Sequence, residues 1–203
     1  MHKTLILFFT VFSIILTGNL VNAQTKVVVV TMGGDEAEEP TEKTIFLTDT
    51  PFNGNLGGIA GADDKCQTEA DNAEPTLTGI YKAWISRTGT PDITTRPSFQ
   101  KHDLPYKNVD GSLIATSFDD FLDGVFPGVI KRKDGSNPIV LAWTGTSSNG
   151  GTTTPNCSNW SNNAAEDFGA SGWNDGGTMP AFDWSSHSIS SCGNTRALYC
   201  FEQ

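Results

Sequence analysis

Side chains that can bind sugars or hard cations gather in the last third of this 203-residue chain. Trp173, Asn174 and Asp175 are consecutive, and Asn159 and Asp183 lie on either side of them. Carboxylate and amide oxygens are the ligands that calcium prefers, and exposed aromatic faces mark binding surfaces. We therefore predict a ligand-binding surface formed by these five residues. The alternative is that "GWNDGG" is a glycine-flanked turn, whose asparagine and aspartate make local hydrogen bonds.

A second acidic group, "DDFLDG", places Asp119, Asp120 and Asp123 within five residues. A metal cluster is one interpretation of three neighbouring carboxylates. The start of a helix, which negative charge stabilises, is the interpretation that we favour. Ser117 stands three residues before Asp120, which is the spacing of a helix-capping pair. We therefore predict a short helical turn capped by Ser117.

The sequence has no strong signature of an enzyme. It lacks Gly-x-Ser-x-Gly, His-Glu-x-x-His and a phosphate-binding glycine loop. His102 and His187 are the only histidines after residue 23. A Ser-His-Asp triad around either of them stays open because such triads have no fixed order, and so do paired carboxylates that cleave glycosides. We predict a non-catalytic protein.

The chain contains four cysteines, Cys66, Cys157, Cys192 and Cys200. An even number of cysteines in an exported protein predicts two disulfides. Zinc is the alternative, but it favours close Cys-x-x-Cys pairs, which the sequence lacks. Four cysteines allow three pairings, and counting alone does not choose among them.

Residues 1–23 have the pattern of a secretory signal peptide. Lys3 precedes an apolar run from Leu5 to Leu16, and small residues stand where a signal peptidase reads, with Ala23 at the cleavage site. A membrane anchor is the alternative, but this run is shorter than the ~20 residues of a span. No later segment is apolar enough to cross a bilayer. We expect a secreted, periplasmic or cell-surface protein.

The net charge argues against two classes of partner. The chain has 13 basic and 23 acidic residues, a net charge of −10, and loss of Lys3 with the signal peptide makes it −11. Such a protein repels phosphate backbones, so we predict neither nucleic acid nor an anionic membrane surface as its partner. Solubility is the simplest interpretation of this charge, and calcium binding by some carboxylates is the alternative.

The apolar pattern divides the rest of the chain into a linker and one domain. Residues 24–42 are acidic and poor in large apolar side chains, which is typical of a linker, although Val27–Val30 could add a strand to a sheet edge of this molecule or of a partner. The domain, 43–203, begins with alternating residues that predict a strand near 44–49. A Pro-, Asn- and Gly-rich turn follows at 50–58.

The domain continues with one helix and further strands. Ile59, Ala62, Cys66 and Ala70 repeat at helical spacing, which predicts a helix that points Cys66 into the core and stops at Pro75. Further strands are expected at 80–86, as a short strand before the helical turn in "GSLIATSFDDFLDG", near 138–145 and in the final "RALYCFE". The Thr-, Ser-, Asn- and Gly-rich stretch 144–163 predicts a long surface loop, in which Cys157 and Trp160 argue for order.

This order of elements, with a cysteine on the first helix and two cysteines late in the chain, resembles the C-type-lectin-like fold. The resemblance implies an α+β domain of mixed twisted sheets, one or two helices and long irregular loops. It implies that the first and last strands pair and that the disulfides are Cys66–Cys200 and Cys157–Cys192. It also implies that most of Trp143, Trp160, Trp173 and Trp184 fill the core.

The chain also looks like a family of exported bacterial domains of unknown function. The matching stretches are "IFLTDTPFNGNLGGIAGADDKCQTEAD", "YKAWIS", "LPYKNVDGSLIA", "WTGT", "NCSNW" and "LYCFEQ", and they cover residues 44–203. The motifs in this order are specific for the fold, whereas they say little about the ligand.

The motifs by which lectins of this fold bind calcium are incomplete. Such lectins carry Glu-Pro-Asn or Gln-Pro-Asp in the long loop and Trp-Asn-Asp a few residues before the late cysteine. Here Trp173 to Asp175 stands about 17 residues before Cys192, Trp184 lacks the Asn-Asp pair, and neither proline triplet occurs. We therefore expect no cofactor, with calcium as the alternative.

Together these patterns predict a non-catalytic recognition or adhesion module outside the cell or at its surface. Its expected partner is a glycan or a host or matrix protein. A structural surface protein without a small ligand is one alternative, and a carboxylate-based hydrolase is the other.

Overall fold

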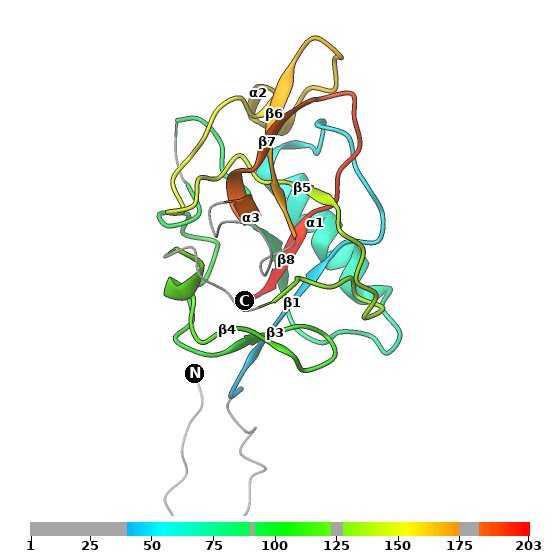
Figure 1. Ribbon diagram of the computed structural model, residues 1–203, viewed down its shortest axis with the longest axis vertical. Helices are drawn as coiled ribbons and strands as arrows, with labels where there is room; N and C mark the ends of the chain where they lie inside the picture. The colour runs from blue at the N-terminus through cyan, green and yellow to red at the C-terminus, as the bar shows by residue number, and fades with distance from the viewer. Residues whose placement is uncertain (1–39, 90–91, 123–127, 175–182) are drawn as a thin grey trace, which may run out of the picture. The chain divides into compact units, whose positions relative to one another are not determined.

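A computed structural model of the chain describes residues 40–89, 92–122, 128–174 and 183–203 (Figure 1). The predicted signal peptide, most of the acidic linker and the valine run lie outside the described residues, so those predictions stay predictions. Asp123 also lies outside them.

The described residues form an α+β fold with two sheets, in agreement with the α+β class that the resemblance implied. Five strands form a mixed sheet in the order β2-β8-β1-β3-β4, and three form an antiparallel sheet in the order β5-β6-β7. The strands are β1 Lys43–Leu47, β2 Tyr81–Ala83, β3 Tyr106–Lys107, β4 Leu113–Ala115, β5 Leu141–Trp143, β6 Phe168–Trp173, β7 Ser188–Ser191 and β8 Tyr199–Glu202. The helical segments are α1 Gly58–Asp71, η1 Asp119–Phe121, α2 Cys157–Trp160 and α3 Asp183–Ser186.

The first and last strands pair at the centre of the larger sheet, as the resemblance implied. Ile45 pairs with Phe201 and Leu47 with Tyr199 in an antiparallel register, and all four side chains are fully buried. Figure 1 shows the blue β1 beside the red β8. The two ends of the domain therefore stabilise each other through the core.

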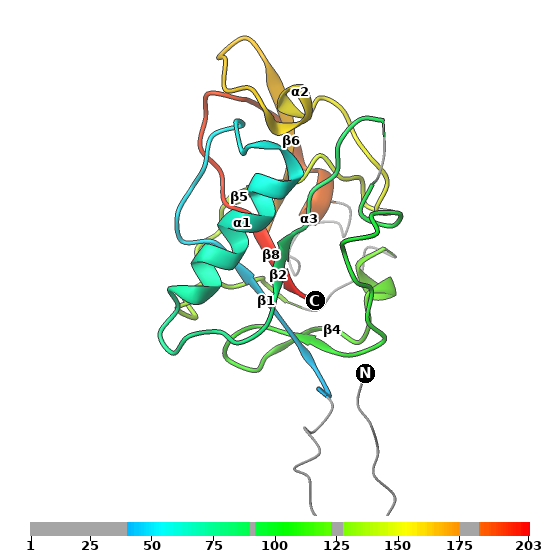
Figure 2. The same cartoon turned by 180° about the vertical axis from the view of Figure 1, so that it is seen from behind.

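Helix α1 covers the edge of this sheet at β2 (Figure 2). Ala62, Cys66 and Ala70 are buried, as their spacing predicted. From the same helix, Asp63 accepts a hydrogen bond from the backbone N–H of Ala83, and Gln67 accepts one from that of Tyr81. These side chains satisfy backbone donors that an edge strand leaves open to pairing with another chain.

The predicted elements differ from the observed ones in their boundaries, and the first and last strands are shifted or shortened to 43–47 and 199–202. Strand β2 covers only part of 80–86, because the chain beyond Ala83 bonds elsewhere: the N–H of Ser86 donates to Thr144. Strand β5 likewise covers only part of 138–145, since Thr144 donates to Ala170. Helix α1 ends at Asp71, before Pro75, where the next residue bonds back to Thr68.

The predicted helical turn forms at η1, but its predicted cap is wrong. The turn follows Phe118, and no side chain caps its first residue. Asp120 instead accepts a hydrogen bond of 2.6 Å from the backbone N–H of Thr116 and a second from the Thr116 hydroxyl. The aspartate therefore reaches back mainly to Thr116, with weaker hydrogen bonds from Ser117, whose own side chain does not cap the turn.

Aromatic side chains dominate the core. Trp84 is fully buried, and its ring lies 4.7 Å from that of Trp184 and 5.1 Å from that of Phe201. Trp143 and Trp160 pack against each other in a second cluster with both disulfides. Trp143, Trp160 and Trp184 therefore fill the core as the resemblance implied, whereas Trp173 is half-buried.

Both disulfides implied by the resemblance are present. Cys66 of α1 is joined to Cys200 of β8 with their Cα atoms 5.4 Å apart, and Cys157 of α2 is joined to Cys192 with theirs 5.6 Å apart. The first bridge links the first helix to the last strand. The second fastens the long loop to the segment after β7.

Within the described residues, no helix has the length and apolar character needed to cross a membrane.

Candidate functional site

Asn159, the first of the predicted site residues, lies in a left-handed turn. All four residues of α2 have φ between 50° and 64°, and the turn is closed by a hydrogen bond from the N–H of Trp160 to Asn156. Asparagine tolerates this conformation better than most residues do. Its Oδ1 accepts a hydrogen bond of 2.9 Å from the backbone of Thr88. Asn159 therefore ties the long loop to the loop after β2.

Trp173 and Asn174 lie at the far end of β6. The Trp173 ring is 4.8 Å from that of His187. The Asn174 side chain is fully buried, accepts a hydrogen bond from the N–H of Val140 and donates to the carbonyls of Ile130 and Pro138. Asn174 therefore crosslinks two backbone segments.

The structure does not bring Asn159 next to Trp173 and Asn174. Asn156 bridges to Gly169 near the start of β6, whereas Trp173 ends that strand, and four residues of strand span about 13 Å. Asp175 lies outside the described residues, and Asp183 opens α3 with a side chain that is not described. The predicted ligand-binding role of these residues stays a prediction.

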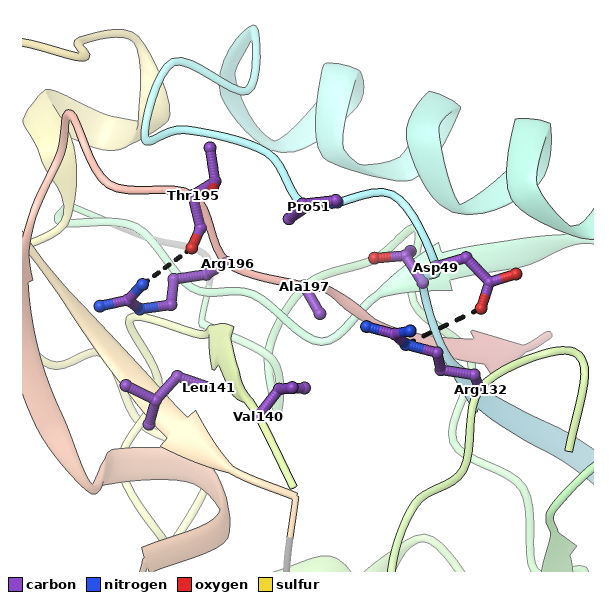
Figure 3. Close-up of a pocket in the computed structure, with 9 residues that line it drawn as sticks. Asp49, Pro51, Arg132, Val140, Leu141, Thr195, Arg196 and Ala197 are labelled. Atoms are coloured by element: carbon purple, nitrogen blue, oxygen red, sulfur yellow. Dashed lines mark hydrogen bonds and ion pairs between the residues drawn. The ribbon is translucent and has the colours of Figure 1, made fainter. Parts of the chain in front are cut away.

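A different set of residues forms a cleft of about 380 Å³, which we call the Arg132 cleft (Figure 3). It lies where the segment after β1, a turn at residue 132, the start of β5 and the segment before β8 meet. Isolated bridges position these backbones: Leu47 to Arg132, Phe52 to Arg196, and Ala142 to Ala197. The cleft is lined by Thr48, Asp49, Pro51, Arg132, Val140, Leu141, Thr195, Arg196 and Ala197.

Arg132 belongs to a basic turn, "KRKDGS", whose three basic residues contact three different parts of the fold. Lys131 forms an ion pair with Asp110, and Lys133 forms one with Glu69 of α1 at 2.7 Å. The turn closes through hydrogen bonds between Arg132 and Ser136 and between Gly135 and Arg132, with Gly135 at φ 79°. The flanking ion pairs therefore hold the backbone of Arg132 at the cleft.

The Arg132 side chain is unusual among the arginines because its donors are unused. It is about one-third exposed, and it makes no hydrogen bond to any residue that the structure describes. Its only ion pair among the described residues is with the Asp49 carboxylate, 3.9 Å from Nε, and its charge also attracts Asp134. Arg196, by contrast, donates to Thr195 and Ser190, and Arg96 donates to Ser98, Ala83 and Asp63. Figure 3 shows the Arg132 guanidinium reaching toward Asp49 and Ala197.

Asp49 faces Arg132 across the cleft without a close contact. Its Oδ1 is shielded from solvent and accepts no hydrogen bond from the described residues. Partial burial, followed by repulsion from Asp134, raises the pKa of Asp49 despite the attraction of Lys133 and Arg132. Asp49 and Arg132 therefore offer an acceptor and a donor group to the same cleft, and neither satisfies the other.

Apolar side chains form the rest of the cleft wall. Pro51, Val140, Leu141 and Ala197 line it, and Thr195 adds an exposed residue at the rim. Asn174 holds this wall in place, because its amide accepts a hydrogen bond from Val140. Asn174, which is one of the predicted site residues, thus positions the cleft wall but does not line the cleft.

Glu69, a neighbour of Asp49, lines a second cavity of about 430 Å³ beside α1. Its carboxylate accepts hydrogen bonds from Lys133 and from the N–H of Asp49. Burial raises its pKa, but hydrogen bonds from Lys133 and Thr50 outweigh this effect, so the pKa of Glu69 lies below its usual value. Lys65 lies over the ring of Phe52 in the same cavity.

Replacing Glu69 with glutamine is expected to reduce the loss of folding stability that occurs when the pH falls from 7 to 3. Because the folded-state pKa of Glu69 lies below its unfolded value of about 4.5, its contribution is present above that value and is lost as the pH falls through the folded pKa. Glu69→Gln should cost about 1 kcal/mol at pH 7 and less at pH 3. Urea denaturation from pH 3 to pH 7 measures this, with the exposed Glu74→Gln as control. An equal loss at both pH values would contradict it.

A third cavity, of about 340 Å³, brings together the residue types of a hydrolytic triad. His102, Asp103 and Ser117 line it with Lys101, Phe118 and Asp119. Burial, followed by the charge of Lys43, lowers the pKa of His102. No hydrogen bond joins the three side chains in the described part of the chain, and Nε2 of His102 has no partner there. The orientation by hydrogen bonds that a triad requires is therefore missing among these residues.

No group of three or more His, Cys, Asp or Glu side chains is arranged to hold a metal ion within the ranges that the structure covers.

Sequence reasoning did not identify Asp49, Arg132 or Arg196. A signal for Arg132 exists, because "KRK" at 131–133 is the only run of three basic residues in an acidic chain. Asp49 and Arg196 carry no comparable signal, since each stands alone beside a strand.

Comparisons with known proteins give a family but no activity. No curated protein matches the chain. The model of a family described as "Protein of unknown function (DUF1554)" matches residues 49–176, a range that contains Asp49, Arg132 and Val140. This match covers more than half of the chain and agrees with the predicted membership of a family of unknown function. The protein therefore belongs to the DUF1554 family.

Proposed function

We propose that this protein is an exported, non-catalytic recognition or adhesion module that binds a glycan or a host or matrix protein through the Arg132 cleft. The observation that carries the proposal is the guanidinium of Arg132. It is partly exposed, reaches into the cleft and makes no hydrogen bond to the described residues.

The chemistry of the cleft suits binding better than reaction. Small-ligand sites combine an apolar wall with a few polar groups that set orientation. Here Pro51, Val140 and Leu141 supply the wall, and Arg132 and Asp49 supply the donor and the acceptor. A ligand that offers both a C–H surface and polar groups would meet each of these features.

Two disulfides support an oxidising location. All four cysteines of the chain are used in them, and disulfides persist mainly outside the cytosol. Together with the signal-peptide pattern of residues 1–23, this favours a secreted, periplasmic or cell-surface protein.

A C-type-lectin-like fold is part of the same proposal. The pairing of β1 with β8 and the bridge from α1 to β8 are two features that the resemblance implied. They support a fold that presents long irregular segments on a closed, crosslinked body.

A carboxylate-based hydrolase is a second candidate, favoured by one observation. Asp49 and Glu69 are neighbours whose pKa values move in opposite directions, as in acid–base pairs. However, Asp49 lines the Arg132 cleft, whereas Glu69 lines the cavity beside α1. A shared substrate would have to contact both sides of the segment between them, so we rank binding first.

A binding screen with a blocked cleft tests the proposal. The wild-type protein is screened against a glycan array and a panel of matrix proteins, with and without calcium. Thr195→Trp places a large ring at the cleft rim and should weaken any binding at least tenfold, because it excludes the ligand. Asn194→Trp is the matched control, since Asn194 is also exposed but does not line the cleft.

Each outcome of this screen bears on the proposed function or on the calcium alternative. No binding to either panel would contradict the proposal and favour a structural surface protein. Binding that Thr195→Trp leaves unchanged would place the site elsewhere and contradict the role of the cleft. If calcium neither raised the melting temperature nor altered binding, the calcium alternative would be excluded.

A further inference from the structure

We infer that the Arg132 cleft recognises the carboxylate of an acidic sugar residue, such as a uronic or sialic acid of a glycan. This inference rests on the proposed function and names the ligand class for the same cleft. It follows from which groups of the cleft are already satisfied and which are not.

The guanidinium of Arg132 makes a carboxylate the expected ligand group. A guanidinium binds a carboxylate with two parallel hydrogen bonds of about 2.7–2.9 Å. The Asp49 carboxylate stands 3.9 Å from the nearest nitrogen of Arg132, which is too far for such a bond. Nε of Arg132 is shielded from solvent, and the two terminal nitrogens, which make no hydrogen bond to the described residues, stay available for a ligand, even in a chain with a net charge of −10.

The charged residues of the cleft favour a ligand group with one negative charge over a ligand group with two. Arg196 also lines it, but its guanidinium is held by Thr195, Ser190 and the face of Trp143. Arg132 is thus the one cation among the lining residues whose guanidinium donates no hydrogen bond in the described structure, although Nε of Arg196 also has no partner there. Asp49 lies beside it and would repel a phosphate dianion, so a singly charged carboxylate fits better.

The rest of the cleft suits the sugar that carries the carboxylate. The Asp49 carboxylate, whose side chain is about one-third exposed, can accept a hydrogen bond from a sugar hydroxyl. Pro51, Val140 and Leu141 can contact the C–H face of the ring. A volume of about 380 Å³ lies within the usual range for small-ligand pockets, about 300–1,000 Å³. Acceptor, donor and apolar wall together describe an acidic sugar.

Calorimetry with paired oligosaccharides tests the inference. The probes are oligomers that carry galacturonate, glucuronate or sialic acid, each beside its form with carboxylates reduced to alcohols, and an acidic peptide. At least one acidic oligomer should bind, and its reduced form should bind about tenfold more weakly or worse, because the charged hydrogen bonds are lost.

Three variants of the full chain separate charge from geometry. Arg132→Ala should weaken binding of the acidic oligomer about 10- to 100-fold. Arg132→Lys should restore only part of it, since lysine keeps the charge without the planar fork. Lys82→Gln, which removes a cation from β2 and not from the cleft, should change nothing. Circular dichroism and melting curves of each variant show that it is folded.

The results distinguish this inference from the proposed function. Equal binding of the acidic and reduced oligomers, or no effect of Arg132→Ala and Arg132→Lys, would overturn the inference while a neutral glycan or protein ligand could still support the module. Binding of the acidic peptide alone would also overturn it, in favour of a protein partner. Failure of every ligand in the broad screen would overturn both.

Discussion

Replacing both Cys66 and Cys200 with alanine is expected to lower the free energy of unfolding by about 5 kcal/mol. The bridge joins residues 134 positions apart, and closing so long a loop removes much conformational freedom from the unfolded chain. Net stabilities of single domains are about 5–15 kcal/mol, so the variant should be close to unfolded at 37 °C. Guanidinium denaturation of the oxidised proteins, followed by circular dichroism, measures the difference.

The second disulfide provides the comparison for this prediction. Cys157 and Cys192 are 35 positions apart, so their replacement with alanine should cost less, about 4 kcal/mol. It should also release the left-handed turn of α2, whose residues 157–160 all have positive φ. If the Cys157/Cys192 variant were clearly less stable than the Cys66/Cys200 variant, local strain and packing would outweigh loop length, and the entropic explanation would be wrong.

Replacing Trp84 with alanine is expected to cost about 3–5 kcal/mol. Trp84 is fully buried and packs against the rings of Trp184, Phe201 and Phe118, at 4.7, 5.1 and 5.7 Å. Its indole N–H also donates to the Ser185 hydroxyl at 2.9 Å. Alanine would leave a cavity in the core that the two sheets share. The Ser185 hydroxyl would also lose its hydrogen-bond donor.

A phenylalanine at position 84 is the matched control. Trp84→Phe keeps an aromatic ring in the cluster but loses the hydrogen bond, so its loss of stability should be clearly smaller than that of Trp84→Ala. Urea denaturation followed by far-ultraviolet circular dichroism compares the two variants. A loss below about 1 kcal/mol for Trp84→Ala, as is usual for surface positions, would mean that the indole is not a central part of the core.

The first two elements of the domain were predictable from local patterns. Alternation around Ile45 and helical spacing from Ala62 to Ala70 identified β1 and α1. The helix buries one face, as its period requires, whereas β1 buries Ile45, Phe46 and Leu47 and therefore both of its faces. The boundaries of β2 and β5 were not predictable, since they depend on which remote backbone groups, such as Tyr199 and Ala170, accept hydrogen bonds from the next residues.

The candidate site was largely unpredictable, for a related reason. Asn174 was an attractive ligand group in the sequence, yet its amide is satisfied by Ile130, Pro138 and Val140. Arg132 was not identified from the sequence, and its availability follows from the 3.9 Å between its Nε and the Asp49 carboxylate. Whether a polar group is free for a ligand depends on partners that are distant in sequence.

The α+β class came from the family resemblance. By itself, the sequence determined the first helix and strand and, through the cysteines, the presence of two disulfides. These features follow from residue type and short-range period, which do not change with the rest of the fold. Only the tertiary structure decided that Asp49, Arg132 and Val140 share a cleft and that Asn159 is far from Trp173. Such neighbours are set by chain pairing across the core, where β1, β5 and β8 bring remote segments together.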